Sequence, residues 1–153
     1  MQTLRTLATS LVLACSTSMA FAQPVVMRIS HQVPPAHHMT KLLESFAADV
    51  KTRTDGQVEV QLFGSEQLAK AGENFPAVAK GTIEAALSVN FQWGKTIPEL
   101  SALTIPYFFT DLERIKRFAQ SDARKFLDSR LDARGVKSVM CLYITRQSIF
   151  TSS

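Results

Sequence analysis

Strand-like and helix-like hydrophobic patterns alternate along this chain of 153 residues, and the alternation restricts the fold more than any other feature. In residues 57–62, valine and leucine alternate with glutamine and glutamate, which is the period of a half-exposed strand. Just before this segment, apolar residues recur every three or four positions, as on one face of a helix of about 17 residues. That stripe consists of Met39, Leu42, Leu43, Phe46, Ala47 and Val50.

Similar patterns occupy most of the remaining chain. The expected strands are Val25–Ser30, Val58–Leu62, Ile83–Val89 and Val136–Ile144, and a further strand can begin at Ser148–Thr151. Later helices are expected over Asn74–Lys80 and after Thr110-Asp111 and Ser121-Asp122, with Phe75, Val78, Ala79, Leu112, Ile115, Phe118, Phe126, Leu127 and Leu131 inward. Strands separated by helices need crossover connections. The patterns therefore predict an α/β fold with a mostly parallel sheet and helices on both faces.

In a parallel sheet of this kind, ligands collect beyond the carboxyl ends of the strands. Three segments follow expected strands and are therefore predicted to lie at this edge: His31–His38, Val89–Trp93 and Thr145–Gln147. The single tryptophan, Trp93, is interpreted either as a core residue or as a wall of a ligand cleft.

The first 22 residues have the composition of a secretory signal peptide. Arg5 precedes an uncharged apolar stretch from Leu7 to Ala20, and Ala20-Phe21-Ala22 supplies the small residues of a cleavage site before Gln23. We therefore expect a periplasmic mature chain that begins at Gln23. One alternative stays open: Val12-Leu13-Ala14-Cys15 loosely resembles a lipoprotein box, which would make Cys15 a lipidated N-terminus.

Composition and motifs argue against several classes of function. A hydrophobic content of 46% and a net charge of +4 are ordinary for a globular protein, and no basic run interleaved with aromatics indicates nucleic-acid binding. The sequence shows no catalytic acid–base pair, nucleophile turn or phosphate loop, so we expect neither an enzyme nor a cofactor. His31, His37 and His38 lack further ligands at metal-site spacing, so no metal is expected. Cys141, alone after signal removal, is interpreted as a buried, inert thiol.

Several short motifs, taken in order, resemble the TRAP-transporter solute-binding proteins (DctP-like). They are Met27–Gln32, Phe46-Ala47, Thr54–Val60, Gly64–Leu68, Lys80–Glu84, Pro98–Leu100, Ile105–Phe109, Arg146 and Thr151–Ser153. The chain departs from the family pattern at Ala69, where a glycine is usual, and at Ala71, where some members carry a polar contact.

The resemblance implies a periplasmic receptor with two α/β domains joined by a hinge. Such a receptor binds a small organic acid (a carboxylate) and delivers it to membrane permease subunits driven by an ion gradient. It also implies about twice this length. Residues 23–153 are therefore expected to be the first domain of a two-domain hinge protein, truncated, with Ile105–Phe109 and Ile144–Phe150 exposed. The alternative is an exported sensor that presents a small molecule to a membrane receptor.

The resemblance also places four candidate substrate-binding residues. Gln32 follows the first expected strand, Asn90 and Gln92 follow the third, and Arg146 matches the arginine of the family's first domain. A guanidinium suits a carboxylate because its planar fork donates two hydrogen bonds. Each residue keeps an alternative role: Gln32 as a loop cap, Asn90 and Gln92 as turn residues, and Arg146 as a surface or hinge salt-bridge partner.

Overall fold

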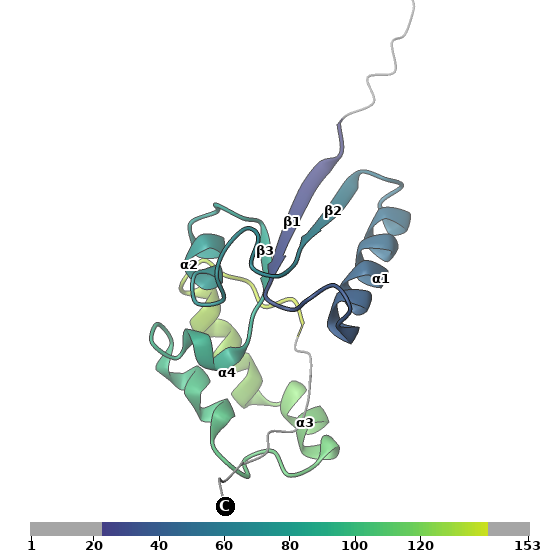
Figure 1. Ribbon diagram of the computed structural model, residues 1–153. Helices are drawn as coiled ribbons and strands as arrows, with labels where there is room; N and C mark the ends of the chain where they lie inside the picture. Colours follow the sequence, from purple (N-terminus) through teal and green to yellow (C-terminus); the bar gives the residue numbers. More distant parts are fainter. Residues whose placement is uncertain (1–22, 141–153) are drawn as a thin grey trace, which may run out of the picture.

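The computed structural model describes residues 23–140, in which three parallel strands form one sheet. They are β1 (Val25–His31), β2 (Val58–Phe63) and β3 (Ala85–Leu87), arranged in the order β2-β1-β3. Val25 pairs with Val58 at the start of β1, and His31 pairs with Leu87 at its end. The predicted parallel α/β fold is confirmed, with β1 as the central strand (Figure 1).

Two crossover helices connect these strands. Helix α1 (His38–Arg53) lies between β1 and β2 in the sequence, and the short α2 (Asn74–Ala79) lies between β2 and β3. The first crossover moves outward from β1 to β2, whereas the second returns across β1 to β3. Right-handed crossovers in opposite directions place their helices on opposite faces. Figure 1 shows α1 and α2 on either side of the sheet.

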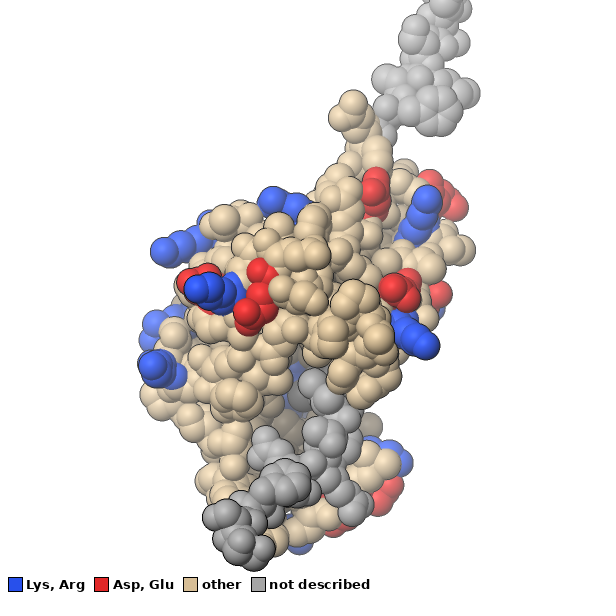
Figure 2. Space-filling view, in the orientation of Figure 1, with Lys and Arg blue, Asp and Glu red and all other residues tan. Residues whose placement is uncertain are grey.

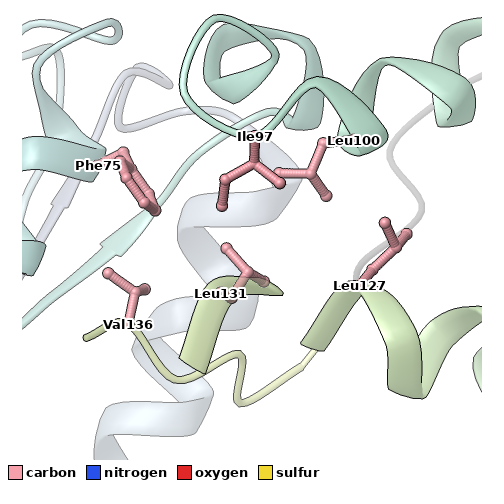
Figure 3. Close-up of a cluster of buried hydrophobic side chains, with 6 residues drawn as sticks. All are labelled: Phe75, Ile97, Leu100, Leu127, Leu131 and Val136. Atoms are coloured by element: carbon pink, nitrogen blue, oxygen red, sulfur yellow. The ribbon is translucent and has the colours of Figure 1, made fainter. Parts of the chain in front are cut away.

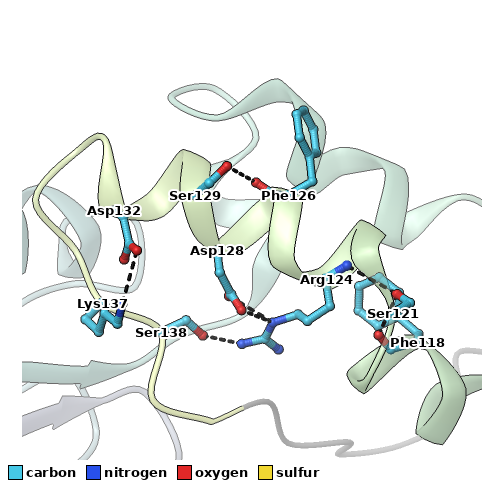
Figure 4. Close-up of polar contacts among 9 residues, drawn as sticks. All are labelled: Phe118, Ser121, Arg124, Phe126, Asp128, Ser129, Asp132, Lys137 and Ser138. Atoms are coloured by element: carbon cyan, nitrogen blue, oxygen red, sulfur yellow. Dashed lines mark hydrogen bonds and ion pairs between the residues drawn. The ribbon is translucent and has the colours of Figure 1, made fainter.

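The chain after β3 is helical. It forms two 3-10 segments, η1 (Asn90–Trp93) and η2 (Pro98–Thr104), and then α3 (Leu112–Ala119) and α4 (Asp122–Asp132). Both later helices begin where the sequence predicts. The side chain of Asp111 accepts from the backbone N–H of Arg114 at 2.8 Å, and Ser121 caps α4 in the same way at 3.2 Å (Figure 4).

The main hydrophobic core joins this helical part to α2. Its six buried side chains come from α2, the start of η2, α4 and the segment after α4, and Figure 3 shows them gathered around one interior region. They are Phe75, Ile97, Leu100, Leu127, Leu131 and Val136. Ile29 of β1 is buried separately, as are Met39 and Leu43 of α1.

Some helical residues predicted to point inward are exposed instead. Leu42 is 46% exposed because α1 buries the narrower face that carries Met39 and Leu43. Phe126 is 49% exposed, and its ring lies 4.9 Å below the Arg130 guanidinium in a cation–π contact. Leu112 is 53% exposed, and α3 contains no buried residue.

Two strand predictions also need correction. The third strand covers only Ala85–Leu87, because the buried Ile83 and the salt-bridged Glu84 precede the ladder rather than join it. Residues 136–140 form no strand, since Val136 packs into the helical core instead of pairing with β3. The rest of that predicted strand, the further strand at Ser148–Thr151 and Cys141 lie outside the described residues.

The surface carries mixed charges and one exposed apolar segment. On the face shown in Figure 2, basic and acidic side chains lie among one another. Ile105, Tyr107 and Phe108 are exposed, as predicted, with Tyr107 at 82%, whereas Phe109 is only partly exposed. The other segment predicted to be exposed, Ile144–Phe150, lies outside the described residues. No helix within residues 23–140 is long and apolar enough to cross a membrane.

Candidate ligand-binding site

The strand order reverses at β1, and this reversal defines the candidate site. The crossovers from β1 to β2 and from β2 back to β3 run in opposite directions, and the loops after β1 and β3 meet at the carboxyl edge of the sheet, where α/β proteins commonly bind ligands. Gln32 directly follows β1, and Gln92 lies in η1, just after β3. Although 60 positions apart in the sequence, they are in contact: Gln92 Nε2 donates to Gln32 Oε1 at 3.0 Å.

A chain of hydrogen bonds extends from this pair. Ser88 Oγ donates to Gln92 Oε1 at 3.0 Å, and the indole N–H of Trp93 donates to Ser88 Oγ at 2.9 Å. All four side chains are partly buried. The edge of the sheet thus carries a connected polar network of Gln32, Ser88, Gln92 and Trp93.

Trp93 anchors the network to the core. Its ring lies 5.2 Å from the buried ring of Phe75, centroid to centroid, and packs against the core cluster. The core interpretation of Trp93 is confirmed, since its ring packs on the core cluster while its N–H donates to Ser88; its role as a wall of a ligand cleft stays a prediction. Ser88 is the network member that the sequence reasoning missed. Ser88 lies four residues before Gln92 and inside the expected strand Ile83–Val89, whereas the observed β3 ends at Leu87 and leaves Ser88 directly after it.

The other two predicted site residues, Asn90 and Arg146, are not part of this hydrogen-bond network as the structure describes it. Asn90 is the first residue of η1 and is half-buried, on the same loop as Gln92. Arg146 lies outside the described residues. The structure therefore brings together Gln32 and Gln92 and places Asn90 on the adjoining loop.

His31, the last residue of β1, is buried beside this edge. Its side chain is 1% exposed, and neither ring nitrogen has a hydrogen-bond partner in the structure. Burial lowers the pKa of His31 below its ordinary value because the charged imidazolium loses its hydration. A Cβ atom at Gly64 would lie 2.7 Å from His31 Cε1, so only glycine allows this close approach. A cavity of about 210 Å³ lies next to the ring and is also lined by Thr40, Glu44 and Gln67.

The three histidines do not form one cluster: His37 and His38 lie together at the start of α1. His37 accepts from the backbone N–H of Met39 through Nδ1 at 3.2 Å and so caps α1, and its ring stacks on His38 at 4.2 Å. His31 lies apart from them, at the end of β1. Within residues 23–140, no group of three or more His, Cys, Asp or Glu side chains is arranged to hold a metal ion.

The parallel sheet with helices on both faces is an α/β fold that solved periplasmic solute-binding proteins share. Residues 29–152 match the family model DctP, described as bacterial extracellular solute-binding protein, family 7. The chain is 31% identical over 130 residues to the C4-dicarboxylate-binding periplasmic protein DctP of Rhodobacter capsulatus, covering 84% of this chain and 39% of that protein. The chain belongs to the DctP family of solute-binding proteins, as its sequence motifs indicate.

Solved structures agree with this assignment. A TRAP periplasmic solute-binding protein from Desulfovibrio salexigens with bound orotic acid is 32% identical and superposes with a TM-score of 0.67, over 72% of this chain and 36% of that one. A relative from Sulfurospirillum deleyianum with bound succinate shares the fold, with a TM-score of 0.66 at 24% identity, over 74% of this chain and 37% of that one. The chain spans less than two fifths of the length of each protein named here.

Proposed function

We propose that this protein is the periplasmic receptor of a TRAP transporter and captures a small organic acid for uptake through membrane permease subunits. In this role it binds and releases its ligand unchanged and is not an enzyme. Family membership supports the transport role, and the proteins similar to this chain include a C4-dicarboxylate-binding periplasmic protein and a TRAP solute-binding protein with bound orotic acid. Residues 1–22 are proposed to direct export, and residues 23–153 to form the first domain of a two-domain receptor.

The contact between Gln32 and Gln92 is the observation that carries this proposal. It joins the loops after β1 and β3 at the point where the strand order reverses, which is where α/β proteins bind ligands. Amide side chains at such an edge offer hydrogen bonds to ligand oxygens without introducing a negative charge that would repel a carboxylate. We propose Gln32, Asn90 and Gln92 as polar contacts, and Arg146 as the group that pairs with the carboxylate.

Calorimetric titration of the complete two-domain receptor, in which residues 23–153 are joined to the second domain, with succinate and with orotate tests the proposal. We expect a carboxylate to bind, and Arg146→Lys to weaken that binding at least about tenfold, which corresponds to about 1.4 kcal/mol. Lysine keeps the positive charge but loses the planar fork that donates two hydrogen bonds to one carboxylate.

The matched control is Arg114→Lys, which makes the same exchange on α3, where the guanidinium pairs with Asp111. This variant is expected to bind like the parent. Equal affinity of Arg146→Lys and the parent would remove Arg146 from the site. Absence of any carboxylate binding by the parent would contradict the proposed ligand class.

A further inference from the structure

In the series of hydrogen bonds at the edge of the sheet, each side chain donates to the next, from Trp93 through Ser88 and Gln92 to Gln32. Trp93 sets this donor-to-acceptor direction. An indole N–H only donates, so Ser88 Oγ accepts from Trp93 at 2.9 Å. The Ser88 hydroxyl then places its single proton on Gln92 Oε1 at 3.0 Å. If the Gln92 amide were reversed, its NH₂ group would face Ser88, and the Ser88 proton would have no acceptor among these side chains.

The orientation of the Gln92 amide determines which end of the Gln32 amide it contacts. With Oε1 held by Ser88, Gln92 presents Nε2 to Gln32 and donates to its Oε1 at 3.0 Å. The carbonyl oxygen of Gln32 is thereby engaged, and its Nε2 forms the free end of the chain. An amide NH₂ group has two N–H donors and accepts no hydrogen bond. No acceptor within residues 23–140 contacts Gln32 Nε2, and this atom is not enclosed in the interior.

We propose that Trp93, Ser88 and Gln92 are positioning residues that hold Gln32 as a hydrogen-bond donor. The site then selects ligands that offer an acceptor oxygen, such as a carboxylate, over ligands that offer an N–H donor at the same place. This inference rests on the proposed function, because it assumes that the edge of the sheet binds a small organic acid. It adds a specific cause of selectivity: Trp93, Ser88 and Gln92 orient Gln32, which is the residue proposed to contact the ligand.

Packing against the hydrophobic core holds the Trp93 indole in place and so keeps the donor-to-acceptor direction of the hydrogen bonds. Trp93 lies 5.2 Å from the ring of Phe75, which is only 5% exposed, so the indole N–H cannot turn away without disturbing the packing. A lone glutamine on a loop would present either end of its amide at nearly equal energy. Here the indole N–H of Trp93, at one end of the series of hydrogen bonds, decides which end of the Gln32 amide faces the ligand.

Nuclear magnetic resonance of the ¹⁵N-labelled chain tests the direction without a ligand. Ser88→Ala removes the link between Trp93 and Gln92, and we expect it to shift the side-chain amide signals of both Gln92 and Gln32 and to speed their exchange with water. Ser88→Thr keeps the hydroxyl and is expected to restore the parent signals. Trp93→Phe keeps a packed ring but removes the N–H, and is expected to shift the same amides. Ser45→Ala, on the exposed side of α1, is the matched control and should leave them unchanged.

Titration of the complete two-domain receptor with succinate and with 1,4-diaminobutane then tests whether the orientation of the Gln32 amide determines which ligands bind. These two molecules have four-carbon chains, with acceptor groups at both ends of one and donor groups at both ends of the other. We expect succinate, and not the diamine, to shift the Gln32 amide signal. Ser88→Ala should weaken succinate binding about fivefold, the factor for one misdirected neutral hydrogen bond.

The outcomes separate this inference from the proposed function. Gln32 and Gln92 signals that are unchanged in both Ser88→Ala and Trp93→Phe would overturn the directional chain. Equal binding of succinate by the parent and Ser88→Ala would overturn its role in selectivity while leaving the receptor function standing. If the amide signals respond as expected but neither succinate nor orotate binds, the directional chain stands and the proposed ligand class is wrong.

Discussion

The guanidinium of Arg28 on β1 donates hydrogen bonds to both carboxylate oxygens of Glu84, the residue before β3. Arg28 Nε donates to Glu84 Oε2 at 2.8 Å, and Nη2 donates to Oε1 at 2.7 Å. The backbone N–H of Arg28 also donates to Oε2 at 2.9 Å, so the Glu84 side chain takes the place of a ladder partner just before β3 begins. The contact joins residues 56 positions apart and fixes where the short third strand meets β1.

This contact predicts a loss of stability in acid. The Arg28 guanidinium and N–H lower the pKa of Glu84 from 4.5 to about 2. Because the folded-state pKa is the lower one, the stabilisation is complete above about 4.5 and is lost as the pH falls toward 2. Glu84→Gln should therefore unfold at lower urea concentration than the parent at pH 7, and the difference should shrink below pH 4.5.

The matched control for this prediction is Glu59→Gln, an exposed carboxylate on β2 whose side chain contacts Gln61 rather than an arginine. It should follow the parent across the same pH range. A constant difference between Glu84→Gln and the parent from pH 7 to pH 3 would show that the Glu84 charge does not stabilise the fold.

Buried His31 predicts a second pH dependence, at higher pH. Its folded-state pKa is lowered by burial, so the neutral ring is favoured in the folded protein and the unfolded chain binds the extra proton. Stability should be complete above the unfolded value of about 6.5 and fall as the pH drops below it. His31→Gln, which cannot titrate, should show a flatter dependence of urea midpoint on pH between 7.5 and 5.5.

His38→Gln removes an exposed histidine at the start of α1 and serves as the control for that measurement. It is expected to retain the slope of the parent. The interpretation of His31 would be wrong if His31→Gln and His38→Gln changed the slope equally.

The core cluster predicts a large difference between two leucines. Leu131 is 4% exposed and packs among the six buried core residues, whereas Leu112 on α3 is 53% exposed. Leu131→Ala should lower the free energy of unfolding by about 2–5 kcal/mol, because it removes buried methyl groups and leaves a cavity. Leu112→Ala should stay within about 0.5 kcal/mol of the parent. Urea denaturation of both variants measures this, and similar losses would contradict the assigned core.

Export is predicted by the first 22 residues, which lie outside the described part of the chain. The protein recovered from the periplasm should begin at Gln23, because Ala20-Phe21-Ala22 provides the small residues that signal peptidase requires. Intact-mass measurement of the secreted chain decides this. A mass that retains Met1 would refute export with cleavage, and a lipidated N-terminus at Cys15 would support the lipoprotein alternative.

The sequence determined the elements whose signals are local. The alternation in Val58–Leu62 identified β2 because side chains on a strand face opposite sides in turn, whichever strands pair with it. The helix starts were readable at Asp111 and Ser121 for the same reason, since each cap bonds an N–H three residues away. The placement of Gln32 and Gln92 after strands also followed from order along the chain and from the resemblance to a known family.

Only the tertiary structure decided which of these residues meet. The direction of each crossover sets the strand order, and the return past β1 brings Gln92 to Gln32 and Glu84 to Arg28. The same packing left Phe126 exposed below Arg130, although its spacing on α4 matches an inward position. Periodicity records which side chains share a face. The partner of that face depends on contacts between residues far apart in the sequence, which no local pattern encodes.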